Sequence, residues 1–153
     1  MKPIRIVVKQ VVWLLVIFAC CEAIAADRKE LVKLTGCQYV AQDYNDGDSF
    51  HVECGTNEFI LRLYFVDAPE TNLRYPERTR EQSEYFGVTL DETMKAGVKA
   101  KEAVRDILQK PFVVWTRWAA AQGRSRVPRY YGFVEIGGKG LAELLVSKGL
   151  ART

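Results

Sequence analysis

A β-hairpin signal dominates the first part of the chain, in the segment CQYVAQDYNDGDSFHVEC at residues 37–54. Its two flanks are rich in strand-forming residues and surround Asp46-Gly47, and Asp-Gly in such a setting is a strong hairpin signal. We expect a hairpin over residues 36–54. A second turn leads to EFILRLYFV at residues 58–66, whose aromatic and branched residues predict a third, largely buried strand.

The rest of the chain predicts two helices and two further strands. The stretch between Pro69 and Thr89 is polar and charged, without an apolar period, and predicts a long surface loop. A capping box at Thr89 and Glu92 opens a helix that ends before Pro111. Strands are predicted in FVVWTRW at 112–118 and RYYGFVEI at 129–136, and a short helix in LAELLVSKG at 141–149.

This order of elements predicts a single α+β domain that is mainly β. The 153 residues, 48% of them hydrophobic, suffice for one core. Five strands, a helix between the third and the fourth strand, and a C-terminal helix suggest a five-stranded OB-type barrel. Such a barrel buries its core without leaving long free sheet edges.

Residues 1–25 are predicted to be a signal peptide, and residues 26–153 the folded domain. Basic residues precede the apolar run VVWLLVIFACC, and Ala23 and Ala25 provide a cleavage site. We therefore expect a secreted or periplasmic protein, with membrane contact only if the signal is retained as an anchor. Cleavage removes three basic residues and one acidic residue, so the formal charge falls from +3 to about +1 and says little about partners.

Two cysteines, Cys37 and Cys54, remain in the mature chain. In an oxidising compartment this pair predicts a disulfide. A tight hairpin turn would place Cys54 opposite Tyr39, so the bond requires a bulge or a longer turn that shifts the pairing by two residues. A structural zinc site is not expected, because two cysteines and the lone His51 cannot supply four ligands.

Charged residues at the turn and at the end of the third strand are the candidates for chemistry. Each has a structural interpretation: Asp48 could cap a turn, Arg62 could lie on an edge strand, and Asp67 to Glu70 could simply terminate a strand. Strict alternation places Arg62 and Asp67 on opposite faces, so they share a pocket only if the strand bends near Val66.

Taken together, these residues indicate phosphodiester chemistry. Carboxylates that lie close together repel each other unless a cation lies between them, and aspartates with backbone carbonyls suit a hard ion such as calcium. Arginines beside such an ion suit a phosphate group, which the planar guanidinium holds with paired hydrogen bonds.

The segments DGDSF, LRLYFVDAPE, GVKAKEAV and LAELLVSKGLAR occur in the order and spacing of the thermonuclease, or staphylococcal-nuclease-like, family. The chain resembles this family over roughly residues 34–152, nearly the whole predicted domain. The most specific element is the R-L-x-x-x-D-x-P-E strand after an upstream D-G-D. The resemblance implies an OB-fold barrel and a calcium-dependent nuclease that cleaves DNA and RNA with little sequence preference.

Carried onto this chain, the resemblance assigns a role to each residue of the motif. Asp48 and Asp67 would bind calcium together with the carbonyl of Ala68. Glu70 would orient or deprotonate the attacking water, and Arg62 would bind the phosphate.

A second phosphate-binding arginine is implied at the start of the fifth predicted strand, in GRSRVPRYYGFVEI. Counting back from GFVEI selects Arg129, with Arg126 as the alternative. The family usually has a Tyr-Gly-Arg turn here, and Val127-Pro128-Arg129 departs from it.

Other residues near the site have open interpretations. Tyr130 and Tyr131 either stack on a base or pack in the barrel. Arg74, Arg78 and Arg80 either guide a polyanionic strand or form a solvated mixed-charge loop.

The rival prediction is a non-catalytic OB-fold module that binds single-stranded nucleic acid or oligosaccharide, because the fold alone does not decide function. A disulfide-stapled structural domain would leave the carboxylates and arginines unexplained. We expect a monomer whose partner is its DNA or RNA substrate.

Overall fold

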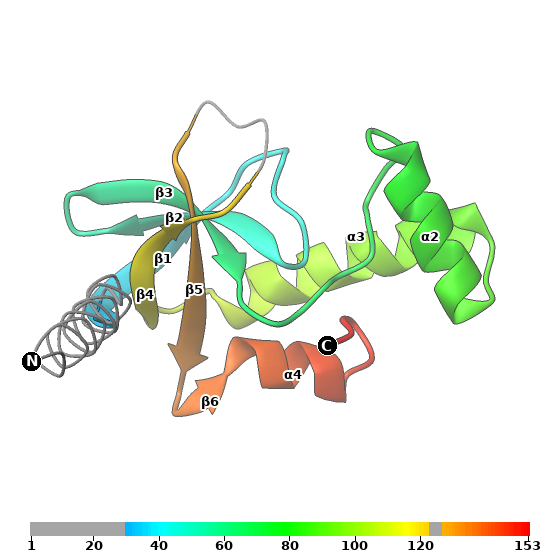
Figure 1. Ribbon diagram of the computed structural model, residues 1–153. Coiled ribbons are helices and arrows are strands. Elements are labelled where there is room, and N and C mark those ends of the chain that lie inside the picture. The colour runs from blue at the N-terminus through cyan, green and yellow to red at the C-terminus, as the bar shows by residue number, and fades with distance from the viewer. Residues whose placement is uncertain (1–29, 123–126) are drawn as a thin grey trace, which may run out of the picture. The chain divides into compact units, whose positions relative to one another are not determined.

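The computed structural model describes residues 30–122 and 127–153, and Leu31–Thr153 form one compact unit (Figure 1). Its strands are β1 (Val32–Val40), β2 (Ser49–Cys54), β3 (Asn57–Leu63), β4 (Phe112–Ala120), β5 (Arg129–Ile136) and β6 (Lys139–Gly140). Its helices are α2 (Pro76–Phe86), α3 (Leu90–Ile107) and α4 (Leu141–Ser147). None of these described helices has the length and apolar character needed to cross a membrane. The predicted signal peptide at residues 1–25 and Arg126 lie outside the described residues.

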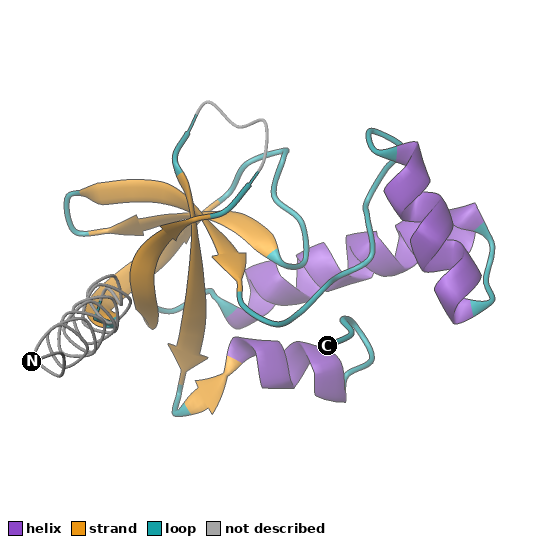
Figure 2. Cartoon of the chain, viewed as in Figure 1, coloured by secondary structure: helices purple, strands orange, loops and turns teal. Residues whose placement is uncertain are grey.

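The six strands form one sheet that closes on itself. The strand order is β3-β2-β1-β4-β5-β6, and β3 also pairs with β5, so that β1 to β5 form a ring of five strands. The β3–β5 pairing is parallel and the others are antiparallel. Figure 2 shows α3 and α4 beside the strands, with α2 farther away. The predicted class, α+β with mainly strands, is confirmed, and β6 is a short strand that the sequence pattern does not predict.

The hairpin of β1 and β2 has the shifted register that the cysteine pair requires. Gln38 lies opposite Glu53, and the strands are joined by the long segment 41–48 instead of a tight two-residue turn. Cys37 and Cys54 form a disulfide with their Cα atoms 4.2 Å apart. The predicted disulfide and the predicted shift of two residues are both confirmed.

Helix α2 corrects the prediction of a surface loop between residues 69 and 89. Pro76 occupies its first turn, where a missing amide hydrogen costs nothing, and Gly87 ends it with a left-handed φ of 65°. The residues that α2 buries are Thr79, Gln82 and Ser83. Because these side chains are polar, the helix has no apolar period for a hydrophobicity pattern to detect.

Helix α3 begins at the predicted capping box, in which the side chains of Thr89 and Glu92 bond each other's backbone amides. Its buried residues are Thr93, Gly97, Ala100 and Val104, whereas the larger Val98 is 42% exposed. Small side chains therefore form the packed face of α3. They allow the backbone of the neighbouring loop to approach the helix closely.

One hydrophobic core holds the strands and helices together. Buried aromatic and aliphatic side chains of β2 and β3 contribute Phe50, Val52, Phe59, Leu61 and Leu63. Leu141 and Leu145 bring α4 into the same core, where both are fully buried. At about 25 cal/mol per Å² of apolar surface, this burial is the main stabilising term for the domain.

Candidate active site

The loop between β1 and β2 places two acidic residues at the start of β2. The side chain of the buried Asn45 donates to the carbonyl of Val40 (2.9 Å) and accepts from the amide of His51 (3.0 Å). These bonds hold the loop, in which Asp48 is 2% exposed and its amide donates to Asp46 Oδ1 (3.2 Å). Burial raises the pKa of both carboxyl groups, and the charge of Asp46 raises that of Asp48 further.

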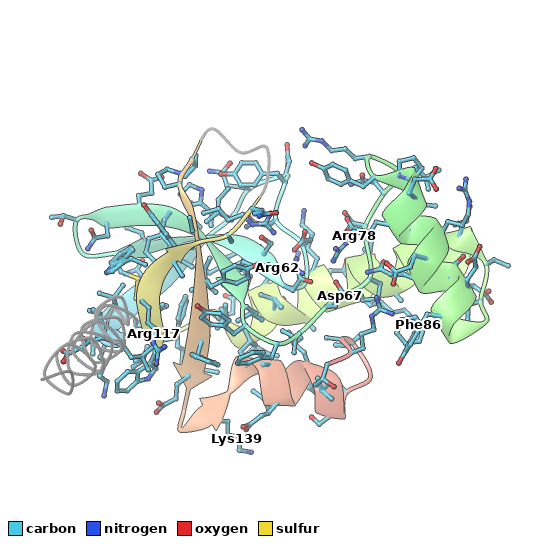
Figure 3. All side chains as sticks on the ribbon, viewed as in Figure 1. Arg62, Asp67, Arg78, Phe86, Arg117 and Lys139 are labelled. Atoms are coloured by element: carbon cyan, nitrogen blue, oxygen red, sulfur yellow. A yellow bond between two sulfur atoms is a disulfide. The ribbon has the colours of Figure 1, made fainter. Side chains whose placement is uncertain are left out.

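A turn at the end of β3 brings Arg62 and Asp67 to the same side. β3 ends at Leu63, and Phe65 in the following turn has a φ of 59° and is 77% exposed, so the chain changes direction just before Val66. Arg62 then donates to Asp48 Oδ1 and lies 3.5 Å from Asp67 Oδ1. The chain thus turns near Val66, which is the condition under which Arg62 and Asp67 can meet on one side (Figure 3).

The segment after the turn lies against both Asp48 and α2. The amide of Ala68 donates to Asp48 Oδ2 (2.7 Å). The amide of Glu70 donates to Oε1 of Gln82 (2.9 Å), while Nε2 of Gln82 donates to Asp67 Oδ2 (3.2 Å) and to the carbonyl of Ala68 (3.0 Å). The residues predicted to bind calcium therefore form one hydrogen-bonded cluster.

Two further arginines join the cluster from outside the motif. Arg78 of α2 donates through Nε to Glu70 Oε1 and through a terminal nitrogen to Asp67 Oδ1, and it lies beside Asp67 in Figure 3. Although burial opposes its charge, the carboxylates of Asp67 and Glu70 raise the pKa of Arg78. Arg152 donates through Nε to Asp67 Oδ2 (3.0 Å) and forms a two-way backbone bridge with Asp67 (2.9 and 3.0 Å).

Arg129 enters the site from the start of β5. The parallel pairing of β3 with β5 places Arg129 opposite Ile60 and Tyr131 opposite Arg62. The Arg129 side chain donates to the carbonyl of Gln122 (3.1 Å). Its Nε is buried and has no hydrogen-bond partner among the described residues. The alternative candidate, Arg126, lies in the part of the chain that the structure does not describe.

A pocket of about 330 Å³ opens where these elements meet. Its lining includes all three predicted catalytic residues, Arg62, Glu70 and Arg129, together with Asp46, Arg78 and Tyr131. Tyr131 also stacks on Tyr64, with ring centroids 4.9 Å apart, whereas Tyr130 packs edge-on against Phe59 of the core. A half-open pocket that is lined by three guanidinium groups and two carboxylates can accept an anion beside a base.

The oxygen atoms of Asp48, Asp67 and Ala68 have the chemistry that calcium prefers. Within residues 30–122 and 127–153, no group of three or more His, Cys, Asp or Glu side chains is placed to hold a metal ion. The set instead consists of two carboxylates and a backbone carbonyl, which hydrogen bonds to Arg62 and Gln82 bring together. The charge of Asp46 raises the pKa of the buried Asp48, and a cation beside the two carboxylates would relieve that repulsion. The donor set therefore fits a hard divalent cation, which would replace guanidinium contacts.

Sequence patterns missed part of this arrangement. The sequence places Arg78 in a surface loop, either as a cation that guides a polyanionic strand or as part of a solvated mixed-charge loop. It places Asp46 in a turn, and it does not single out Gln82 or Arg152. One signal was available for α2, because Arg78 and Gln82 are four residues apart and therefore share a helix face. That signal is useful only once the helix itself is known.

The geometry described above is the basis for assigning a function. Compared with protein-family models the chain matches no family, and compared with curated proteins it matches no sequence.

Proposed function

We propose that this protein is a secreted, calcium-dependent nuclease of the staphylococcal-nuclease-like type, which hydrolyses phosphodiester bonds in DNA and RNA with low sequence specificity. One observation carries the proposal: Arg62, Arg129 and Glu70, which come from two strands and a loop, line a single pocket. The ring of five strands and the helix between β3 and β4 support an OB-type barrel as its fold.

The two strand arginines are suited to hold the phosphate. Each guanidinium offers several N–H donors in one plane, which matches two oxygen atoms of a phosphodiester. Arg129 is the better placed to accept a new partner, because its buried Nε is unpaired among the described residues. Such donors also stabilise the extra negative charge that builds on the phosphoryl oxygens as water attacks.

Glu70 is suited to act as the general base. It lines the pocket, and burial raises the pKa of its carboxyl group, while the charge and hydrogen bond of Arg78 oppose that rise. In the proposed step Glu70 takes a proton from water, and the water oxygen bonds to phosphorus. The leaving oxygen departs with the electron pair of its broken bond to phosphorus and takes a proton from solvent. A positioned general base typically contributes about 100-fold to 10,000-fold to the rate.

Asp48, Asp67 and the carbonyl of Ala68 would hold the calcium ion. When bound, the ion would supply positive charge to the phosphoryl oxygens during the attack. The buried carboxylate of Asp48, the half-buried carboxylate of Asp67 and the carbonyl would hold it close to Glu70, because residues 67–70 are adjacent in the chain.

Secretion is supported by the disulfide. Cys37 and Cys54 are bonded, and disulfides persist mainly in extracellular and periplasmic proteins. Calcium is also available there at the concentrations that weak, open sites need.

Cleavage of single-stranded DNA, duplex DNA and RNA by the purified protein tests the proposal. Wild type is compared with Glu70→Gln, in calcium and in chelator, and Glu102→Gln on the exposed side of α3 is the matched control. We expect calcium-dependent cleavage that chelation abolishes, a rate about 100-fold to 10,000-fold lower in Glu70→Gln, and an unchanged rate in Glu102→Gln.

Two results would contradict the proposal. Cleavage that neither chelator nor Glu70→Gln reduces would place the chemistry at a different site. A wild-type protein that binds single-stranded nucleic acid without cutting it would favour the non-catalytic OB-fold module.

A further inference from the structure

The side-chain amide of the buried Gln82 forms hydrogen bonds with three of the four residues from Asp67 to Glu70. Its side chain is 1% exposed, although α2 lies at the edge of the site. Its partners are the amide of Glu70, the carboxylate of Asp67 and the carbonyl of Ala68, at 2.9, 3.2 and 3.0 Å. A single side chain from α2 therefore contacts two of the proposed calcium ligands and the backbone of the proposed base.

These partners determine which way the amide of Gln82 points. A backbone N–H can only donate, so Glu70 must face Oε1, and the Nε2 group then faces the two acceptors. A glutamate at this position would keep the shape and the acceptor but lose both donors, and it would add a negative charge next to Asp67. A methionine would keep the approximate volume and lose all three bonds.

The neighbouring buried residues of α2 have different partners. Ser83 donates to the carbonyl of Arg80 (3.0 Å), within the same helix. Thr79 donates to the carbonyls of Asn72 and Tyr75 (3.2 and 3.3 Å), which precede the helix. Removing the hydroxyl of Ser83 therefore tests the effect of a buried polar group on α2 without touching Asp67 to Glu70.

We propose that Gln82 is a positioning residue that orients Asp67, Ala68 and Glu70 toward a bound divalent cation and toward the attacking water. The inference deepens the proposed function and rests on it. Side chains that hold metal ligands from behind typically change metal affinity or activity about 10-fold to 100-fold when they are replaced. Gln82 meets that description because it bonds Oδ2 of Asp67, whereas Oδ1 is contacted by Arg62 and Arg78, which a cation would displace. Its bond to the carbonyl of Ala68 leaves the second lone pair of that oxygen for the cation.

The test compares Gln82→Met, Gln82→Glu and the control Ser83→Ala with wild type. Terbium luminescence and its displacement by calcium measure cation binding without nucleic acid. Hydrogen exchange measures the protection of the Glu70 amide, and cleavage rates are measured across a range of calcium concentrations.

We expect Gln82→Met to weaken cation binding about 10-fold to 100-fold and to expose the Glu70 amide to exchange, with a higher half-saturating calcium concentration for cleavage. Excess calcium should restore part of its activity, and circular dichroism at each calcium concentration separates this effect from stabilisation of the fold by the bound ion. Gln82→Glu should keep the Glu70 amide protected, because Oε1 remains, and still change cation binding. Ser83→Ala should match wild type in cation binding and in Glu70 protection.

Each opposite outcome is distinguishable. In one outcome, wild type binds the cation and cuts DNA, and Gln82→Met has the same cation affinity as Ser83→Ala. This outcome would overturn the role of Gln82 and leave the nuclease function standing. A wild-type protein that neither binds terbium nor cuts would overturn the proposed function, and the positioning role with it.

Discussion

Asp67 receives hydrogen bonds from four side chains, which are Arg62, Arg78, Gln82 and Arg152. A carboxylate has about four lone-pair positions on its two oxygens, so this one is saturated. A cation that binds Asp67 must therefore displace at least one donor. Arg62 and Arg78 are the natural ones to leave, since both also line the pocket where a phosphate would take up their N–H groups.

Arg62 gives the sharpest prediction at the scale of a residue. Arg62→Lys keeps a positive charge beside the buried Asp48, so the fold should be retained. A lysine ammonium cannot reproduce the two parallel N–H groups, and we expect the cleavage rate to fall about 100-fold to 1,000-fold. Single-turnover cleavage and thermal unfolding measure the two effects.

The control for Arg62→Lys is Arg117→Lys, an exposed position on β4 that should change neither quantity. An Arg62→Lys variant with wild-type cleavage would show that charge alone suffices at this position.

At the scale of elements, helix α3 approaches the backbone of Pro69 and Glu70 at Gly97. A Cβ atom there would lie 2.5 Å from the carbonyl oxygen of Pro69 and closer still to that of Glu70. Neither neighbour is a flexible side-chain end, so the backbone itself would have to shift. The absence of a side chain at Gly97 thus sets the distance between α3 and Glu70.

Gly97→Ala should therefore destabilise the protein, against the usual helix rule. In a solvated helix the change would gain about 1 kcal/mol, but overpacking here should cost about 1–3 kcal/mol net and lower the cleavage rate as Glu70 moves. Urea unfolding and cleavage assays measure both. Ala96→Gly is the control, because it should lower the stability by about 1 kcal/mol and leave the cleavage rate unchanged. A Gly97→Ala variant that is more stable than wild type would contradict the close contact between α3 and the backbone of Pro69 and Glu70.

The capping box of α3 predicts a pH-dependent contribution to stability. Hydrogen bonds from the backbone and side chain of Thr89 lower the pKa of Glu92 below its ordinary 4.5. Because the folded pKa is the lower one, the stabilisation is present above about pH 4.5 and is lost as the pH falls through the folded value. The melting temperature of wild type should exceed that of Glu92→Gln at neutral pH, and the difference should shrink in acid.

Glu102→Gln, farther along α3, provides the comparison for Glu92→Gln. A difference between wild type and Glu92→Gln that stays constant from neutral to acid pH would show that the charge of Glu92 does not contribute.

The same elements show what a sequence can and cannot predict here. The hairpin and α3 were predictable because the strand-forming flanks on either side of residues 41–48 and the Thr89–Glu92 box are local signals. Asp46-Gly47 does not form the tight two-residue turn that its sequence suggests, because the connection is longer. Helix α2 was not predictable, because its buried residues are polar. Polar residues stabilise a helix from a buried position only through hydrogen-bond partners that the folded chain brings close. For the same reason Gln82 and Arg152, which lie 15 and 85 residues from Asp67 in the chain, could not be assigned to it in advance.

At the scale of the whole molecule, the disulfide links the fold to the site. Cys37 and Cys54 are 17 residues apart, and the loop that they close contains Asn45, Asp46 and Asp48. The disulfide joins the open end of the hairpin, opposite the connecting segment 41–48 that holds these three residues. It supports the shifted register of β1 and β2, which makes that connecting segment long. The chain-entropy model assigns a loop of this size about 3 kcal/mol of stabilisation.

Replacing both cysteines, Cys37→Ala with Cys54→Ala, should therefore lower the free energy of unfolding by about 2–4 kcal/mol. Urea unfolding measures this loss in three samples: the variant, oxidised wild type, and wild type under reducing conditions. The free energies of unfolding of oxidised and reduced wild type should also differ by about 2–4 kcal/mol. Because Asn45 holds the loop independently of the disulfide, the folded variant should retain its cleavage rate well below the unfolding midpoint. If cleavage is lost while the fold remains, the disulfide itself orients Asp48, and the hydrogen bonds of Asn45 do not suffice to hold the loop.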